Sequence, residues 1–321
     1  MIHHPDPEPE LAFVPCYSAA GTFSHRMGFW LWGDATAAHV VLCVHGLSRQ
    51  GRDFDTLCRA LLQRAESQHG AGNVRIVCPD VVGRGESDWL TDPTGYQIAT
   101  YASDMLALLG HLHQQAPVTQ LDWVGTSMGG LIGMAVCGHP AGQAALPVPV
   151  RRLVLNDVGP VIEWQALQRI GSYLGKAGHF ASVEAGAEAL RLVSSGFGPH
   201  TPQEWLALSR PMLRRIAQLD ATWRLHYDPA LAVPFAQATE ASNQESQAML
   251  WQLYDAISAQ TLLLRGADSD LISRETALAM GQRGPRATLI EFAGVGHAPT
   301  LVAADQTRAV AGFLWPDAVF D

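Results

Sequence analysis

Short, nearly continuous apolar runs recur along the first half of the chain, and segments in which apolar residues have helical spacing separate them. Continuous runs of Val, Leu, Ile and Cys are typical of strands covered on both faces, as in a parallel sheet. Strands that alternate with helices indicate right-handed β-α-β crossovers. The strand-like runs lie at 13–17, 27–32, 39–46, 73–83, 120–125 and 151–159, and the helical segments at 54–67, 99–115 and 127–140.

This alternation stops near residue 160. Residues 161–258 show helical patterns and several aromatic side chains, but no convincing strand. The strand-like pattern returns at 259–266 and 287–294, ahead of a helical segment at 303–315. We therefore predict an α/β fold with a mostly parallel central sheet of about eight strands. Its core domain comprises residues 1–160 and 259–321, and residues 161–258 form an inserted helical cap, or lid.

Composition and charge exclude several classes of protein. The 321 residues are 48% hydrophobic and 16% charged, which is too apolar for a disordered chain. The net charge of −9 argues against nucleic acid or an anionic membrane surface as a partner, because either would require a basic face. Nearly all cationic residues are arginine, and Lys176 is the only lysine, which we attribute to codon usage.

The termini and cysteines bear on location. The first ten residues, MIHHPDPEPE, lack the apolar stretch of a signal peptide, and no run of 18 apolar residues predicts a membrane span. The five cysteines are odd in number and show no C-x-x-C spacing, so we expect reduced thiols. These features predict a cytoplasmic protein. We also expect a monomer or a homodimer that acts on a small molecule.

The strongest chemical signal is the segment GTSMGG, which begins at Gly125. It follows a strand-like run and opens a helical one, which is the context of a G-x-S-x-G nucleophile elbow. In such an elbow the serine occupies a strained turn, and side chains two residues before and after it would collide. Ser127 is therefore the candidate nucleophile, with Gly125 and Gly129 making room for the turn.

A serine hydroxyl requires a base, and the base requires a carboxylate that orients it. We expect His297 to be the base, because it lies in a glycine-flanked loop just after a late strand. Asp268, Asp270 and Asp157 all lie between the serine and this histidine and could supply the carboxylate. We prefer Asp270, because Leu271 and Ile272 directly after it can anchor its loop; Asp157 is the main alternative.

The negative charge that develops in acyl transfer requires two preorganised N–H donors. We expect these to be the backbone amides of Met128, directly after the nucleophile, and of Leu47, in the loop after the strand 39–46. His45 ends that strand, and we expect it to brace the loop. The chain contains neither H-E-x-x-H nor any other metal-ligand spacing, so no metal and no other cofactor is expected.

Taken together, these segments resemble the α/β-hydrolase fold superfamily over nearly the whole chain. Residues 161–258 occupy the place of the family's helical cap. The family usually carries its acid three residues beyond the glycine that ends the penultimate strand, where this chain has Ser269. Besides the elbow, the resemblance rests on VHGLSRQGRDFD (44–55), PDVVGRGESDW (79–89), LVLNDVGP (153–160), LLLRGADSDLIS (262–273) and GVGHAPTL (294–301).

The resemblance implies a serine hydrolase that cleaves a small carboxylic ester or lactone through an acyl-enzyme. Haloalkane dehalogenases and epoxide hydrolases are excluded, because their elbow carries an aspartate in place of Ser127. C–C bond hydrolysis of ring-cleavage products and perhydrolysis remain open as other serine chemistries. A small-ligand receptor or signalling protein that retains the triad is the alternative from another class.

Substrate contacts are expected mainly from residues 161–258. The alternative to substrate binding, for most of the aromatic residues in this segment, is a structural role in which they pack the cap against itself. Arg49 could meet a substrate carboxylate, or it could simply be ion-paired or solvated. The candidates for the pocket wall are Trp164, Tyr173, Phe180, Phe197, Trp205, Trp223, His226, Tyr227 and Phe235.

Overall fold

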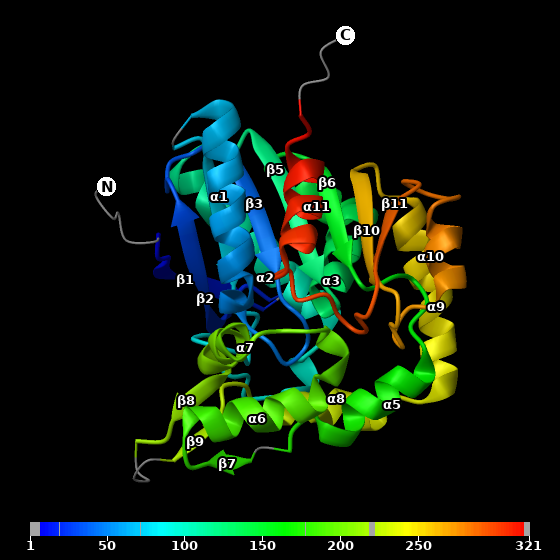
Figure 1. Ribbon diagram of the computed structural model, residues 1–321. Coiled ribbons are helices and arrows are strands. Elements are labelled where there is room, and N and C mark those ends of the chain that lie inside the picture. The colour runs from blue at the N-terminus through cyan, green and yellow to red at the C-terminus, as the bar shows by residue number, and fades with distance from the viewer. Residues whose placement is uncertain (1–6, 19, 71, 177, 218–221, 318–321) are drawn as a thin grey trace.

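The computed structural model describes residues 7–18, 20–70, 72–176, 178–217 and 222–317. An eight-stranded sheet forms its centre, with the strand order β1-β2-β4-β3-β5-β6-β10-β11 (Figure 1). β1 and β2 pair antiparallel at one edge, and the six strands from β4 to β11 are parallel. The strands are β1 (Glu10–Tyr17), β2 (Phe23–Gly33), β3 (His39–Val44), β4 (Val74–Pro79), β5 (Gln120–Thr126), β6 (Val150–Asn156), β10 (Gln260–Gly266) and β11 (Thr288–Phe292). The predicted mostly parallel sheet is thereby confirmed.

Helices cover both faces of this sheet. α1 and α11 contact each other on one face, and α2, α3 and α9 contact one another in sequence on the other. Alternate residues of β3 serve the two faces: Val41 and Cys43 belong to the apolar cluster of α1 and α11, whereas Val40 and Leu42 belong to that of α2 and α3. The helices are α1 (Asp55–His69), α2 (Ile98–Gln115), α3 (Met128–Gly138), α4 (Pro140–Ala145), α9 (Glu240–Asp255), α10 (Arg274–Met280) and α11 (Ala304–Leu314).

The inserted segment, residues 161–258, leaves the sheet after β6 and returns to it at β10. Its helices α5 (Trp164–Tyr173), α6 (Val183–Val193), α7 (Pro202–Ser209) and α8 (Ala232–Gln237) lie below the edge where the parallel strands end (Figure 1). α9 lies instead along the core. A Cβ atom at Gly138 of α3 would come within 2.1 Å of the Leu253 carbonyl oxygen, so a glycine permits this close packing.

The prediction that the inserted segment contains no strand is wrong. A small antiparallel sheet in the order β7-β9-β8 lies within it, separate from the central sheet. Strands of two or three residues are too short to show the alternation that identifies a strand in a sequence. They are β7 (His179–Phe180), β8 (Leu213–Arg215) and β9 (Trp223–Leu225).

The inserted segment is joined to the core through the loop that follows β4. The backbone N–H of Gly85 donates to the His226 carbonyl at 3.0 Å, and the N–H of Asp228 donates to the Gly83 carbonyl at 2.7 Å. These hydrogen bonds flank a β-bridge between Arg84 and Tyr227. The segment therefore has a fixed attachment close to the strand ends.

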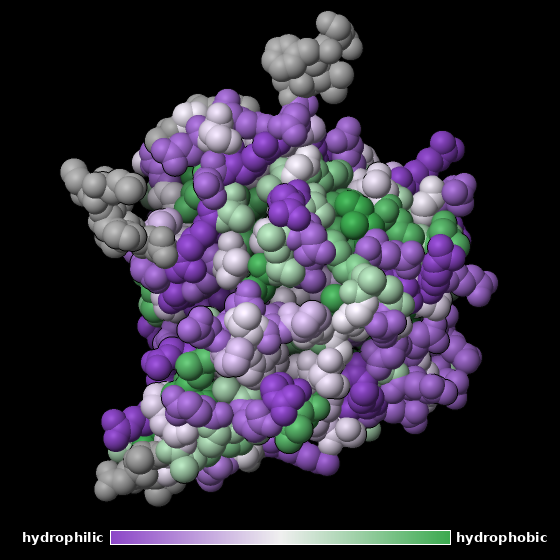
Figure 2. All heavy atoms as spheres, in the orientation of Figure 1, coloured by the Kyte–Doolittle hydropathy of each residue, from purple (hydrophilic) through white to green (hydrophobic). Residues whose placement is uncertain are grey.

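The outer surface is mixed in character. Figure 2 shows polar and apolar side chains interspersed over the face seen in Figure 1. Among the described residues, no helix is long and apolar enough to cross a membrane. All five cysteines are buried and free.

Candidate active site

Ser127 occupies a strained turn between β5 and α3. Its backbone has φ 51° and ψ −117°, a conformation that side chains rarely adopt. A Cβ atom at Gly129 would lie 1.9 Å from the Val44 carbonyl oxygen, and one at Gly125 would lie 2.4 Å from the Gly129 carbonyl oxygen. Both glycines are thus required sterically, as the elbow pattern predicts.

A series of hydrogen bonds links Ser127 to a buried carboxylate. Ser127 Oγ lies 3.0 Å from His297 Nε2, and His297 Nδ1 lies 2.8 Å from Asp157 Oδ2. Asp157 is completely buried, and it also accepts hydrogen bonds from the Gly266 backbone N–H at 2.8 Å and from the Ser269 hydroxyl at 2.6 Å. With Nδ1–H directed at the carboxylate, Nε2 is free to accept the serine proton, which is the arrangement that a serine nucleophile needs.

The position preferred for the acid, Asp270, does not contact His297. Its exposed carboxylate pairs with the Arg169 guanidinium of α5, at 2.6 Å and 2.9 Å. The alternative, Asp157, is the carboxylate that reaches the imidazole. Its backbone adopts φ 56° directly after β6, and its N–H donates to the Leu264 carbonyl of β10, which holds the residue between the two strands.

Asp268 is exposed in the same loop, and its backbone N–H donates to the Val295 carbonyl at 2.9 Å. The sequence holds one hint about the carboxylate. Ser269 occupies the position at which the family usually has its aspartate, which favours a carboxylate from a different strand end.

The expected oxyanion donors lie beside the serine. Leu47 and Met128 both line a cavity that Ser127 also lines. Within the described part of the chain, the backbone N–H groups of Leu47 and Met128 have no hydrogen-bond acceptor, and Met128 begins α3, where the helix dipole favours negative charge. They are therefore available to a negatively charged oxygen on the carbon that Ser127 would attack.

Arg84 contacts both residues that carry the expected oxyanion donors. It is completely buried, its Nε donates to the Leu47 carbonyl at 2.8 Å, and its Nη2 lies 3.4 Å from Met128 Sδ. Its guanidinium also lies over the ring of Tyr101, 4.9 Å from the centroid. One side chain thus touches both residues whose amides would bind the oxyanion.

His45 braces the same loop, as expected. Its Nδ1–H donates to the Gly46 carbonyl at 2.7 Å, and its Nε2 accepts from the Val81 backbone N–H at 2.9 Å. Complete burial lowers the pKa of His45 to about 3, so the ring is neutral at physiological pH.

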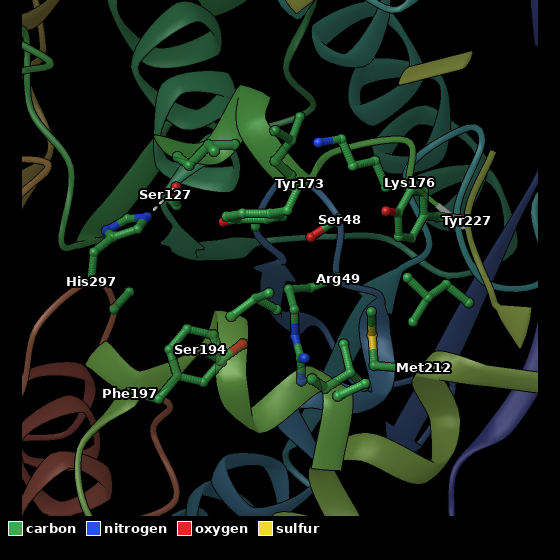
Figure 3. Close-up of a pocket in the computed structure, with 18 of the residues that line it drawn as sticks. Ser48, Arg49, Ser127, Tyr173, Lys176, Ser194, Phe197, Met212, Tyr227 and His297 are labelled. Atoms are coloured by element: carbon green, nitrogen blue, oxygen red, sulfur yellow. Dashed lines mark hydrogen bonds between the residues drawn. The ribbon is translucent and has the colours of Figure 1, made fainter. Parts of the chain in front are cut away.

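Two cavities meet at Ser127. The first cavity, of about 370 Å³, is lined by His297 as well as Ser127, and its far wall comes from the inserted segment (Figure 3). The second cavity, of about 840 Å³, is lined mainly by apolar side chains of α2, α3, α8 and α9 and does not include His297. Ser127, Leu47 and Ile170 line both cavities.

Some of the residues predicted to bind substrate line the cavities at Ser127, and others do not. Tyr227 and Arg49 line the first cavity, but Arg49 is ion-paired with Asp53 at 2.5 Å. Neither cavity is lined by Trp164 or His226. His226 instead lies in the attachment of the inserted segment, where its Nε2 is 3.4 Å from an Arg214 nitrogen, and burial lowers its pKa.

Sequence reasoning missed two cations of the first cavity, Arg169 and Lys176. The available signal was that Lys176 is the only lysine in an arginine-rich chain. Ser48, Ser194 and Met212 also line this cavity and were not singled out.

One buried group elsewhere could offer three ligand atoms to a metal ion. Within the described residues it consists of Cys16, His25 and Asp104, whose ligand atoms lie within 4.8 Å of one another. His25 Nε2 already lies 3.0 Å from Asp104 Oδ2, so these polar groups satisfy one another between β1, β2 and α2. They take no part in the site around Ser127.

Comparison with known proteins agrees with this fold. Residues 41–312 match the sequence model of the alpha/beta hydrolase family. A 3-hydroxybutyrate-oligomer hydrolase of Cupriavidus necator is 45% identical over 295 residues, which are 92% of this chain and 94% of the relative. A solved alpha/beta hydrolase of Novosphingobium aromaticivorans is 32% identical, with a TM-score of 0.76, over 96% of this chain and 98% of that one.

A more distant structure shares the fold alone. E-2-(acetamidomethylene)succinate hydrolase is 18% identical, with a TM-score of 0.72, over 95% of this chain and 99% of that one. The resemblance drawn from the sequence motifs is confirmed by the family match and by the sheet topology. The protein is therefore a hydrolase and belongs to the alpha/beta hydrolase family.

Proposed function

We propose that this hydrolase cleaves carboxylic esters through an acyl-enzyme on Ser127, and that its natural substrates are short linear oligomers of 3-hydroxybutyrate. The observation that carries the reaction is the hydrogen-bonded series from Ser127 through His297 to Asp157. The substrate class is supported by the 45% identical relative, whose alignment covers 94% of its own length. Such oligomers are chains of carboxylic esters, which is the bond type that this series of residues can cleave.

The proposed steps use this arrangement of residues. Ser127 Oγ attacks the ester carbonyl carbon while His297 Nε2 takes its proton, and Asp157 stabilises the imidazolium that forms. The carbonyl oxygen becomes an oxyanion, held by the amides of Leu47 and Met128. The C–O bond to the leaving alcohol then breaks, and His297 returns the proton to that oxygen. Water attacks the acyl-enzyme by the same route and releases the acid.

Residues 161–258 act as the lid of this site. Helices α5 and α6 of this segment supply Arg169, Ile170 and Leu190 to the wall of the first cavity. A substrate that fills the cavity should therefore order this wall. Hydrogen exchange of α5 and α6 should slow when Ser127 carries a bulky phosphonate, and unchanged exchange would contradict a lid role.

The direct test of function is product analysis with a linear 3-hydroxybutyrate trimer. We expect many turnovers to shorter acids, and a loss of about 10⁵–10⁶-fold in kcat for Ser127→Ala. Ser67→Ala, an exposed serine on α1, is the matched control and should retain full activity. Fewer than one turnover per molecule would instead indicate a ligand receptor, and no reaction with the trimer would reject the substrate class.

A further inference from the structure

We propose that the first cavity holds the carboxylate end of the substrate and that Lys176 binds this carboxylate, so that cleavage releases units from the carboxyl end of the oligomer. This inference rests on the proposed function and adds to it which end of the chain is recognised. Its basis is the charge of the cavity wall, together with the position of His297 relative to the two cavities.

The described wall of the first cavity carries positive charge and no acidic side chain. Among the described residues that line it are three cations, Arg49, Arg169 and Lys176, and no aspartate or glutamate. Opposite charges close by favour binding of an anion, and a wall without carboxylates does not repel it. In a chain of net charge −9, this cavity is therefore suited to an anionic ligand.

Two of the three cations already have partners outside the cavity. Arg49 is held by Asp53 with contacts of 2.5 Å and 2.7 Å, and Arg169 by Asp270 with contacts of 2.6 Å and 2.9 Å. Lys176 forms no ion pair within the part of the chain that the structure describes. Its ammonium group is the charge that remains for a ligand.

The position of Lys176 suits the end of a bound chain. In Figure 3, Ser127 and His297 lie at one side of the cavity and Lys176 and Tyr227 at the other. Lys176 itself is exposed, so it stands at the mouth of the cavity. A ligand that reaches from Ser127 to this mouth would bring its terminal carboxylate to the ammonium group.

The two cavities divide the substrate according to the catalytic groups that line them. The leaving oxygen takes its proton from His297, so the leaving alcohol must lie on the side of His297, in the first cavity. The acyl part then extends into the second cavity, which Leu47, Ser127 and Met128 line but His297 does not. That cavity is also apolar and more than twice as large, so it can take the longer remainder of the chain.

The chemistry of the oligomer agrees with this division. Each linear chain of a hydroxy acid ends in one hydroxyl and one carboxylate. A leaving alcohol placed in the first cavity is the part of the chain that carries the free carboxylate. The cavity of about 370 Å³ admits a short end segment, and Lys176 would hold that end before and after cleavage.

The test compares a linear 3-hydroxybutyrate trimer as the free acid with its methyl ester, which lacks the terminal charge. The wild-type enzyme should show a higher kcat/KM for the free acid. Lys176→Met should raise KM for the free acid roughly fivefold at low salt, with kcat unchanged, because an exposed ion pair contributes binding that is equal in the ground and transition states. Its KM for the methyl ester should not change.

Three further variants separate charge from structure. Lys176→Arg should keep the preference for the free acid. Asp270→Asn removes the partner of Arg169 and should lower KM for the free acid. Arg308→Met removes an exposed cation on α11, away from the cavity, and should behave as wild type. With the terminal carboxyl unit of the trimer isotopically labelled, the first cleavage should place the label in the monomer and leave the dimer unlabelled.

Equal rates for the two trimers in the wild-type enzyme would overturn this inference and leave the proposed function intact. The same holds if Lys176→Met slows both substrates equally, or if the label stays in the longer product. No hydrolysis of either trimer would overturn the proposed substrate and this inference together.

Discussion

The Ser269 hydroxyl donates a hydrogen bond of 2.6 Å to Asp157 Oδ2, the same oxygen that lies 2.8 Å from His297 Nδ1. Ser269 occupies the loop position after β10 at which the family usually places its acid. Here the charge comes from the end of β6, and the loop after β10 contributes a neutral donor. In the proposed site, two neighbouring strand ends would together orient the imidazole, Asp157 directly and Ser269 through Asp157.

Ser269→Ala should lower kcat about tenfold, because Asp157 loses one of the hydrogen bonds that hold the oxygen facing His297. KM should change little, since the hydroxyl is directed at Asp157. Steady-state kinetics with a short p-nitrophenyl ester measure this effect, and Ser269→Thr, which retains a hydroxyl, is the control. A variant with wild-type kcat would show that the hydrogen bond has no role in catalysis.

The two candidate acids should respond very differently to amide substitution. Asp157→Asn keeps the shape but favours the wrong imidazole tautomer, so turnover should fall about 10⁴-fold. Asp270→Asn breaks only the ion pair with Arg169, and kcat should stay within a few-fold of wild type. The measurement is kcat of both folded variants under the same conditions. A large loss in Asp270→Asn with little loss in Asp157→Asn would identify Asp270 as the acid.

The sheet and the serine–histidine pair could be predicted because each has a local signature. Buried parallel strands are continuous apolar runs, and the strained turn at Ser127 requires glycine at two fixed positions. The acid has no comparable local motif, apart from Ser269 at the position where the family usually has its aspartate. Its identity depends on which of Asp157 and Asp270 reaches His297. A backbone hydrogen bond to Leu264, more than a hundred residues away in the chain, holds Asp157 beside β10, whereas Asp270 pairs with Arg169.

The unpaired charge of the first cavity could not be predicted from the sequence, because it too depends on contacts between distant residues. The pairing of Arg169 with Asp270 joins α5 to the loop after β10, across 101 positions of the chain. Only this contact shows that Arg169 is paired, while Lys176, seven residues later, has no such partner among the described residues.

The three short strands of the inserted segment could not be predicted, because they span too few residues for an alternating pattern of apolar and polar side chains to show.

Arg84 should prove to be a positioning residue for the oxyanion donors. Arg84→Met removes its hydrogen bond to the Leu47 carbonyl, so the loop that presents the Leu47 amide is less well held. We expect kcat to fall about tenfold to a hundredfold, with KM little changed, because the oxyanion forms only in the transition state. Denaturant unfolding of the same sample corrects for any unfolded fraction. A rise in KM with kcat unaltered would contradict this role.

Stability should decrease as the pH falls below about 6.5, in part because of His45. The folded protein holds this ring neutral, with a pKa of about 3, whereas the unfolded chain protonates it near 6.5. The unfolded state therefore binds more protons between these values, and this group should cost about 2 kcal/mol of stability between pH 7 and pH 5. Urea unfolding at both pH values, for wild type and His45→Gln, isolates the contribution. An equal loss in the two proteins would contradict it.

The central claim is that Ser127 is the nucleophile of an ester hydrolase, and covalent labelling tests it most directly. Stoichiometric fluorophosphonate should add one group per molecule, peptide mapping by mass spectrometry should locate it on Ser127, and ester hydrolysis should be lost in proportion to labelling. An adduct on another residue, or full activity in the labelled protein, would contradict the account.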